Sequence, residues 1–599
     1  MTQQLPLRQE LPVEETWQLE LLFDSQATYE EALGKFKLQL TQFVETYNGK
    51  LAEEEVLLAS LKDYGDLYQQ LYHLSAYASL AYETDKLNET FEINMNQMED
   101  LYEWQAKQLT FYKHQLVELD SAVLEAVSNS EAGAEYKAYL EDLLRKKETF
   151  LSQEVEEVLS GLDNSIFNQY RQYLTMKLQD MTFDNFEVEG KTYANSFNGF
   201  EGDYEVHPNS EVRKKAWASF HDGLRRFENS AAVNYINYVQ TQKKMASLRG
   251  FDTTIDYLLF DQKVSNEAYN RQIDIIMSEF APVMRRYARM LAQEHGVEKV
   301  SLADIKMSFS TAEAATISIA DSRKMIEEAL SVLGEEYSDI VKTAFEERWI
   351  DYPMNQTKST GGFCSTIYNG PSYILLNWTG LMSEVLVLAH ELGHAGHFQL
   401  TNRNQNILTP EASLYFIEAP STANEVIMCQ YLLNQPISNE QKRILIGEFI
   451  SRTYFHNMVT HLLEADFQRK VYLAIEKGDV LNASRLNAFF KETLQTFWGE
   501  DVEINDGAEL TWMRQPHYFI GLYSYTYSAG LTIGTQIGQR IANREEAAIE
   551  SWLEVLRAGG TLNPIELAAK AGVSMKDGEA LRTAISFVDG LLDQMEALK

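Results

Sequence analysis

Apolar residues recur at helical spacing along most of this 599-residue chain. Leu67, Leu71, Leu74 and Ala78 fall on one stripe, which is the pattern of a helix packed against a core. Similar patterns continue through residues 17–116, 148–171, 209–296, 301–349 and 440–500. The pattern predicts a mostly α-helical protein.

Two segments depart from helical spacing. Residues 186–193 alternate apolar and polar side chains around Gly190, which predicts a short hairpin. Residues 371–378 follow the paired glycines Gly361 and Gly362 and are typical of a strand. The unpaired edge of such a strand suits an extended peptide held by main-chain hydrogen bonds; the alternative is an ordinary core strand.

The division of the chain into lobes follows from the same pattern. Helical spacing stops near residue 182, and we place a soft boundary close to residue 200. We therefore expect an N-terminal helical lobe of residues 1–200 and a second lobe of residues 201–599 that carries the chemistry. No low-complexity linker separates the two, so they should share an interface.

The composition of the chain indicates which kinds of molecule it can bind. Hydrophobic residues at 45% and charged residues at 23% are ordinary for a globular protein. The 88 acidic and 52 basic residues give a net charge of -36, which would repel nucleic acid and anionic lipid. Residues 1–10 lack the apolar core of a signal peptide, no run of 18 apolar residues occurs, and the two cysteines, Cys364 and Cys429, suit a reducing compartment. We expect a cytoplasmic protein with neither nucleic acid nor membrane as a partner.

Three of the eleven histidines lie close together, at 390, 394 and 397. His390 and His394 are four residues apart, so on a helix their imidazoles share one face and can bind one metal ion. Glu391 completes the H-E-x-x-H arrangement, in which the histidines bind zinc and the glutamate acts on water as a general base. Residues 385–389 are apolar, so we expect a buried helix, where ionisable groups are costly unless paired or bound to metal. A catalytic zinc usually has three protein ligands, so a third is needed.

This stretch and a later one resemble the oligoendopeptidase F family, relatives of thimet oligopeptidase and neurolysin. The family signature joins an H-E-x-G-H-x-x-H helix to a downstream E-x-P-S-x-x-x-E segment, and both occur here, at residues 390–397 and 418–425. The resemblance implies that Glu418 is the third zinc ligand and that Glu425 is a carboxylate just outside the ligands. It also leads us to expect His397, the last histidine of the signature, among the substrate-binding residues.

Pro420 complicates the segment that carries Glu418, because a proline inside a helix removes a hydrogen-bond donor and crowds the preceding turn. Either a helix capped by Thr409 and starting at Pro410 is kinked by Pro420, or a new helix begins at Pro420 with Glu418 just before it. We prefer the kinked helix, because it puts Glu418 and Glu425 on one face.

Residues 512–527 form a second informative segment, with three tyrosines at alternate positions after Pro516 and His517. Without the zinc helix, the segment would be interpreted as an aromatic core strand or loop. With that helix, it resembles the family's P-H-F-x-x-P-F-Y-x-Y-x-Y segment, whose histidine and tyrosines stand near the scissile bond. Gly521 and Leu522 depart from the family pattern.

These departures leave open which tyrosine points at the metal. We rank Tyr525 first, followed by Tyr523 and Tyr527. His517 and Tyr525 are expected to donate hydrogen bonds to the oxyanion as it forms, and Tyr523 and Tyr527 to bind substrate.

We interpret His456 and His461 as structural residues. They are five residues apart, a spacing that does not align two ligands on an α-helix. We therefore expect neither of them in the active site.

The resemblance implies two helical lobes that enclose a deep active-site channel, with a small β-sheet beside the zinc helix. It implies one Zn²⁺ per chain, held by His390, His394 and Glu418, with Glu391 as general base. Because a deep channel excludes folded proteins, the implied activity is an endopeptidase that cleaves short unstructured oligopeptides. Two alternatives remain: a zinc exopeptidase such as a carboxypeptidase, which needs a group that binds the peptide terminus, and a peptide-binding protein without activity, against which the intact Glu391 argues.

Overall fold

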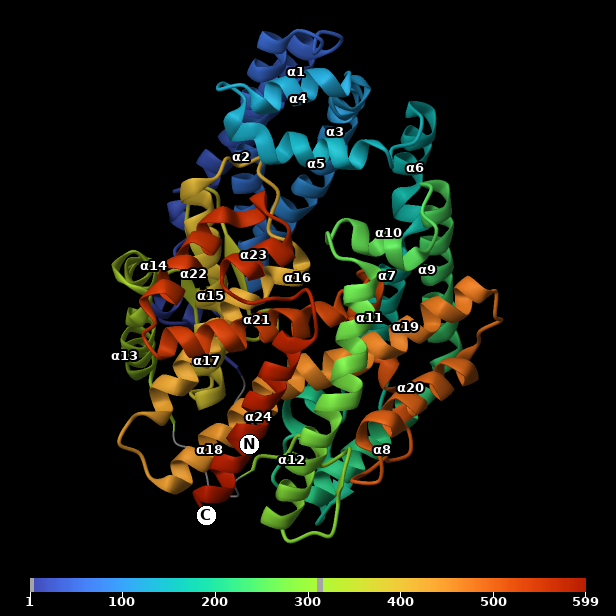
Figure 1. Cartoon of the computed structure of the whole chain (residues 1–599), viewed down its shortest axis with the longest axis vertical. Helices are drawn as coiled ribbons and strands as arrows, with labels where there is room; N and C mark the ends of the chain where they lie inside the picture. Colours follow the sequence, from blue (N-terminus) through green and yellow to red (C-terminus); the bar gives the residue numbers. More distant parts are fainter. Residues whose placement is uncertain (1–4, 310–315) are drawn as a thin grey trace.

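The computed structural model describes residues 5–309 and 316–599. Residues 1–4 of the N-terminal segment and residues 310–315 of the predicted helical region 301–349 lie outside the described residues. Within 316–349, two predicted helices are confirmed as α13 (Ile319–Leu330) and α14 (Glu335–Glu346). The prediction of a mostly α-helical protein is confirmed (Figure 1).

The N-terminal helices gather at one end of the molecule (Figure 1). They are α1 (Gln26–Tyr47), α2 (Glu54–Thr84), α3 (Glu89–Glu118), α4 (Ser121–Asn129) and α5 (Lys137–Lys147). The first begins at Ser25, whose side chain accepts a hydrogen bond from the N–H of Thr28 as a helix cap. Buried side chains such as Phe36, Leu57 and Leu116 form a core of their own among these helices.

A second and larger core holds the rest of the chain together. It extends in sequence from Tyr173 to Met595 and contains Phe200. The boundary expected near residue 200 therefore lies within this core by packing, and the change from one core to the other falls before Tyr173.

The helices around the larger core are numbered in chain order (Figure 1). The first group is α6 (Gln153–Ile166), α7 (Gln169–Thr175), α8 (Ser210–Arg225), α9 (Glu228–Leu248), α10 (Thr254–Phe260), α11 (Asn266–Ile275) and α12 (Ala281–Glu294). The second group is α15 (Met382–Asn404), α16 (Leu414–Ile417), α17 (Ala419–Leu433), α18 (Asn439–Phe449), α19 (His461–Lys477), α20 (Ala483–Trp498), α21 (Ser524–Ala542), α22 (Glu546–Ala558), α23 (Pro564–Lys570) and α24 (Glu579–Ala597). Helix α17 packs against both α15 and α21, and the three helices form the centre of this part.

The predicted hairpin is confirmed as β1 (Phe186–Val188) paired antiparallel with β2 (Lys191–Tyr193). Its two loop residues, Glu189 and Gly190, both have positive φ, as a two-residue hairpin loop requires. A parallel pair joins β3 (Val300–Ser301) to β7 (Val502–Glu503).

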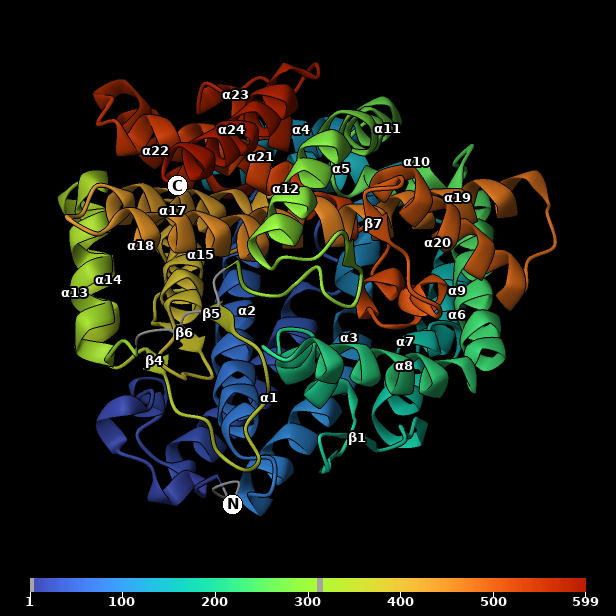
Figure 2. The same cartoon turned by 90° about the horizontal axis from the view of Figure 1, so that it is seen from below.

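A small sheet lies beside α15, as the resemblance implied (Figure 2). Its strand order is β4 (Ile350–Asp351), β6 (Ser372–Leu375), β5 (Phe363–Thr366). The prediction that the strand after Pro371 offers an unpaired edge was wrong, because β6 is fully buried and paired on both sides. The edge that faces α15 belongs to β5 instead.

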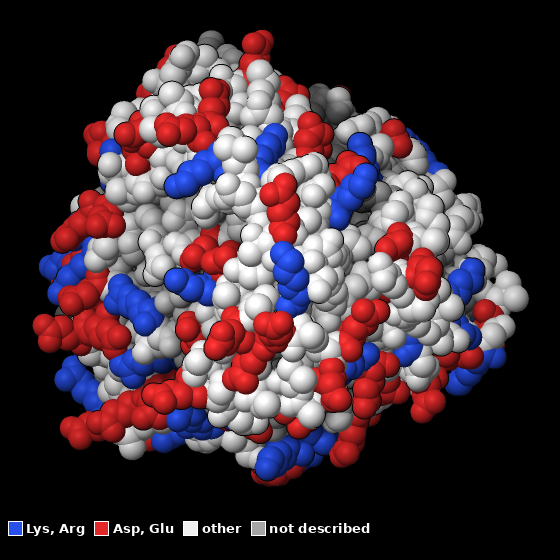
Figure 3. Space-filling model, turned by 90° about the horizontal axis from the view of Figure 1, so that it is seen from above, with Lys and Arg blue, Asp and Glu red and all other residues white. Residues whose placement is uncertain are grey.

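Charge is spread over the surface. Acidic and basic side chains are interspersed on the face drawn in Figure 3, with acidic groups in the majority. Within residues 5–309 and 316–599, no helix is both long enough and apolar enough to cross a membrane.

Candidate active site

The metal-binding pair lies in the middle of α15. The N-terminus of this helix is capped by Glu384, whose carboxylate accepts the backbone N–H of Leu381 at 3.3 Å. The imidazole rings of His390 and His394 face the same side, with centroids 5.0 Å apart. The predicted helical spacing of the pair therefore holds.

Glu418 lies at the junction of two helices, just before Pro420. The helix expected to run from Pro410 through Pro420 with a kink does not form; α16 ends at Ile417 and α17 starts at Ala419. The alternative of a new helix, with Glu418 just before it, is the observed arrangement. Its physical reason is that proline is tolerated in the first turn of a helix, where its missing N–H would have no intrahelical partner.

The three side chains meet at one point. Glu418 Oε2 lies 3.4 Å from Nε2 of His390 and 3.4 Å from Nε2 of His394. Zinc bonds to nitrogen and oxygen of 2.0–2.2 Å in a tetrahedral site put neighbouring ligand atoms about 3.3–3.5 Å apart. The residues present therefore fit a zinc ion held by two imidazoles and one carboxylate.

A close helix contact sets this geometry. A Cβ on Gly393 of α15 would lie 2.5 Å from the Cα of Ser421 and 2.6 Å from the carbonyl oxygen of Pro420. Only a residue without a side chain lets α15 approach α17 so closely. On the other side of α17, a Cβ on Gly530 of α21 would lie 2.5 Å from the Cβ of Glu418. Close contacts at Gly393 and Gly530 thus fix the start of α17, and with it Glu418.

Glu425 lies directly behind the metal group. One oxygen lies 2.7 Å from Nδ1 of His390, and the other accepts a hydrogen bond from the hydroxyl of Thr453. A carboxylate on the second ring nitrogen of a ligand histidine fixes the tautomer and orientation of that ring. Nε2 of His390 is thereby turned toward Glu418.

Glu391 follows His390 on α15, and its carboxylate lies close to the sheet. Its side chain is 6% exposed, and a Cβ on Gly362, next to β5, would lie 3.6 Å from its Oε1. Burial raises the pKa of Glu391, and the neighbouring histidines His390 and His394 oppose that shift. A carboxylate with a raised pKa beside a metal group is suited to accept and return a proton.

Two of the three tyrosines face the histidine of the same segment. Because α21 begins at Ser524, Tyr523 and Tyr527 are one helical turn apart and share a side of the helix. Their ring centroids lie 5.4 Å and 5.6 Å from that of His517. Burial raises the pKa of both phenols, and the carboxylate of Glu418 contributes to both shifts. The pair is thus close to both His517 and Glu418.

Tyr525 lies apart from this group. The structure therefore does not support ranking it first among the tyrosines expected to point at the metal. Its hydroxyl donates to Oε1 of Gln262 at 2.6 Å, its ring packs against Tyr269 and Tyr415, and the residue is 1% exposed. Alternate positions on a helix point to different sides, so the tyrosine between Tyr523 and Tyr527 points into the core.

His397 is also placed differently from the expectation. The residue is 1% exposed and packs against Phe398 and Phe416, and neither ring nitrogen has a hydrogen-bond partner within the part of the chain that the structure describes. Burial and nearby His394 lower its pKa to about 3, so the ring is neutral. A buried neutral imidazole of this kind does not face a substrate.

Sequence reasoning missed one pair altogether. His456 and His461, interpreted as structural, have their Nε2 atoms 3.1 Å apart, and His461 stacks on Tyr527 with centroids at 4.1 Å. The reason is a π-helix, η10 (His456–Thr460), whose wider turn aligns residues five apart. No feature of the sequence marks it.

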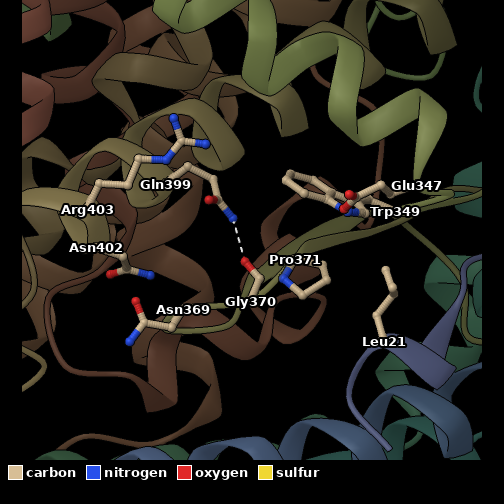
Figure 4. A pocket seen from close by; sticks show the side chains of 9 residues that line it. All are labelled: Leu21, Glu347, Trp349, Asn369, Gly370, Pro371, Gln399, Asn402 and Arg403. Carbon is tan, nitrogen blue, oxygen red and sulfur yellow. Dashed lines mark hydrogen bonds between the residues drawn. The ribbon is translucent and has the colours of Figure 1, made fainter. Parts of the chain in front are cut away.

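A separate pocket lies at the far end of α15 (Figure 4). Its residues from α15 follow His394 by five to nine positions, and none of its lining residues belongs to the metal group. The pocket is lined by Leu21, Glu347, Trp349, Asn369, Gly370, Pro371, Gln399, Asn402 and Arg403.

Comparison with known proteins shows the family of this chain. The model of peptidase family M3 matches residues 204–587, more than half of the chain, and a model described as oligopeptidase F matches residues 97–183. The chain therefore belongs to peptidase family M3. It is a metallopeptidase of the oligoendopeptidase F type, which confirms the resemblance found in the sequence.

Individual relatives cover nearly the whole chain. Oligopeptidase PepF of Bacillus subtilis (strain 168) is 24% identical over 99% of this chain and 89% of its own length. A solved structure from Chlamydophila abortus has a TM-score of 0.86 at 22% identity and covers 100% of both chains. Oligoendopeptidase-F from Enterococcus faecium has a TM-score of 0.74 at 20% identity and covers 95% of this chain and 98% of its own. At these identities the solved structures establish a shared fold.

Proposed function

We propose that this metallopeptidase is a zinc-dependent endopeptidase that hydrolyses internal bonds of short unstructured oligopeptides. The observation that carries the proposal is the meeting of His390, His394 and Glu418 at 3.4 Å, with the carboxyl group of Glu391 buried on the same helix. When bound, zinc supplies Lewis acidity that polarises the scissile carbonyl and acidifies water.

The residues of the chain carry the remaining steps. Glu391 removes a proton from the attacking water and passes it to the amine that leaves. His517 and Tyr523 donate hydrogen bonds to the oxyanion; this role passes from Tyr525 to Tyr523 because only the latter faces the metal group. The ring of Tyr527 packs edge-on against that of Tyr523, with centroids 5.1 Å apart, and orients it.

The substrate backbone is assigned to β5. This strand pairs only with β6 in the described part of the chain and contacts α15, so its outer edge can add an extended peptide as one more strand. Main-chain recognition fits a peptidase that accepts many sequences. The deep channel between the lobes remains part of the proposal, and it restricts the substrate to unfolded segments.

A cytoplasmic location also belongs to the proposal. Cys364 and Cys429 are both unpaired, which suits a reducing compartment.

The test uses metal removal together with peptides of defined ends. The protein is stripped with a chelator, reloaded with one equivalent of zinc, and incubated with a mixed peptide library whose members are free or blocked at both ends. We expect no cleavage before reloading and equal cleavage of free and blocked peptides afterwards, read by mass spectrometry. Cleavage of free peptides alone would assign an exopeptidase, and no cleavage after reloading would contradict a catalytic role for zinc.

A further inference from the structure

A buried carboxylate outside the metal group contacts His517 and the start of α21. Glu464, on α19, is 2% exposed. One of its oxygens lies 2.9 Å from Nδ1 of His461, 3.0 Å from the hydroxyl of Ser524 and 3.6 Å from Nδ1 of His517. Burial would raise the pKa of Glu464, but His461 and His517 hold it well below its usual range, so the group is an anion. One oxygen therefore faces two histidines and the first residue of α21.

This carboxylate also acts on the tyrosines through His461. The ring of His461 stacks on Tyr527 at an interplanar angle of 16°. With its Nδ1 directed to Glu464, His461 presents Nε2 to His456, 3.1 Å away. His456 is solvent-exposed, but protein atoms around it exclude enough water to lower its pKa. A residue on the wall of a concave site has both features.

We propose that Glu464 is a positioning residue for catalysis: its carboxylate orients His517 directly, and through His461 it fixes the ring of Tyr527 beside the metal group. The inference rests on the proposed function, in which His517 and Tyr523 hydrogen-bond to the oxyanion. An anion behind Nδ1 of a histidine holds the ring so that Nε2 points at the substrate, as carboxylates do behind the histidines of other hydrolases.

The alternative occupant of this cluster is a second metal ion, because His461, Glu464 and His517 offer ligand atoms within 4.8 Å of one another. Hydrogen bonds account for the distances better. The 2.9 Å between His461 and Glu464 is shorter than the separation of about 3.3 Å between ligands of a tetrahedral zinc, and it matches a charge-assisted hydrogen bond. Nε2 of His461 is engaged by His456 as well.

The experiment compares Glu464→Gln with a matched control on the same helix. Asp466→Asn also neutralises a buried carboxylate, which accepts hydrogen bonds from Arg469 at 3.0 Å and Thr493 at 2.6 Å and contacts neither His517 nor the tyrosines. In zinc-loaded protein, Glu464→Gln should lower kcat by about 10- to 100-fold with KM and zinc content unchanged. Asp466→Asn should leave kcat at the wild-type value.

A second readout does not depend on turnover. A phosphinic peptide has a tetrahedral phosphorus that resembles the oxyanion, so its affinity should fall in Glu464→Gln by the same factor as kcat/KM. An unchanged affinity for this compound, or equal loss of kcat in Asp466→Asn, would leave Glu464 with a structural role alone and overturn the inference. So would a second zinc ion per wild-type chain that Glu464→Gln removes.

A double-mutant cycle shows whether Glu464 acts through His517. Glu464→Gln should lower kcat by a smaller factor in the His517→Asn background than in the wild-type background. An equal factor in both backgrounds would overturn the inference. If Glu464→Gln does not fold, Glu464→Asp supplies the same cycle, because it keeps the charge but withdraws it by one methylene. If zinc-loaded wild-type protein cleaves no peptide, the proposed function fails first, and this inference fails with it.

Discussion

The metal group around α15 and α17 and the hydrogen-bonding group on α19, on α21 and on the segment before α21 differ in how far their polar atoms are satisfied. In the metal group, Glu418 lies 3.4 Å from both histidines, and Glu425 supports His390 at 2.7 Å. In the other group, Nδ1 of His517 and Oε1 of Glu464 are buried and have no hydrogen-bond partner among the described residues.

This difference indicates how ready each group is for its ligand. The metal group is rigid and set for an ion, because glycine contacts hold its helices at fixed distance. The hydrogen-bonding group is less tightly set, because the contact between Glu464 and His517 is long, and catalytic hydrogen bonds are often long until substrate binds. The 3.6 Å between His517 and Glu464 is such a distance.

The largest effect is expected from Glu391→Gln, which tests whether the metal side holds its ion independently of catalysis. Because Glu391 is not a ligand, the variant should keep one zinc per chain and bind peptide normally. Its kcat should fall by about 10² to 10⁴-fold, the contribution of a general base. Zinc content, peptide affinity and hydrolysis are measured on one preparation. A variant that holds zinc and cleaves at nearly the wild-type rate would remove Glu391 from the mechanism.

The next effect is expected from Tyr523→Phe, on the hydrogen-bonding side. Burial raises the pKa of this phenol, so it stays protonated and can donate. Loss of one oxyanion donor costs about 2.7 to 4 kcal/mol, or 10² to 10³ in kcat, with little change in KM. Steady-state kinetics on a quenched peptide checks the split. An effect on KM alone would make Tyr523 a substrate-binding residue.

The metal side could be predicted from sequence further than the other side. His390, His394 and Glu391 lie on one helix, and their relation depends on the helical repeat alone. The approach of Glu418 depends on a contact between two helices, and it was expected only because the segment resembles a known family. The position of Pro420 allowed either a kinked helix or a new helix. The new helix, which we did not prefer, is observed, because proline suits the first turn of a helix.

The hydrogen-bonding side could not be predicted, for two physical reasons. Tyrosines at alternate positions have the period of a strand, and the start of α21 at Ser524 puts Tyr523 and Tyr527 on one face with Tyr525 in the core. The pairing of His456 with His461 requires a π-helix, which has no marker in the sequence. In both cases the spacing of the residues does not reveal the period of the element that forms.

A smaller effect is expected from Glu425→Gln, which tests how far the rigidity of the metal side depends on the carboxylate behind it. The amide keeps the shape of the side chain but holds Nδ1 of His390 less firmly. Zinc affinity should weaken by about 10- to 100-fold. Competition with a chelator of known affinity measures the change, with Asp466→Asn as the control. Unchanged zinc affinity would show that the packing of α15 on α17 orients His390 without help.

The smallest effect is expected from Tyr525→Phe, which sharpens the comparison because it repeats the change made at Tyr523 only two residues away. The variant loses the hydrogen bond to Gln262 and leaves that buried amide oxygen without its donor. The free energy of unfolding should fall by about 1–3 kcal/mol, measured by denaturant unfolding, while kcat and KM of the folded protein stay at wild-type values. If Tyr525→Phe instead lowered kcat as Tyr523→Phe does, the core position of Tyr525 would not describe the working enzyme, and the first ranking of the tyrosines would be restored.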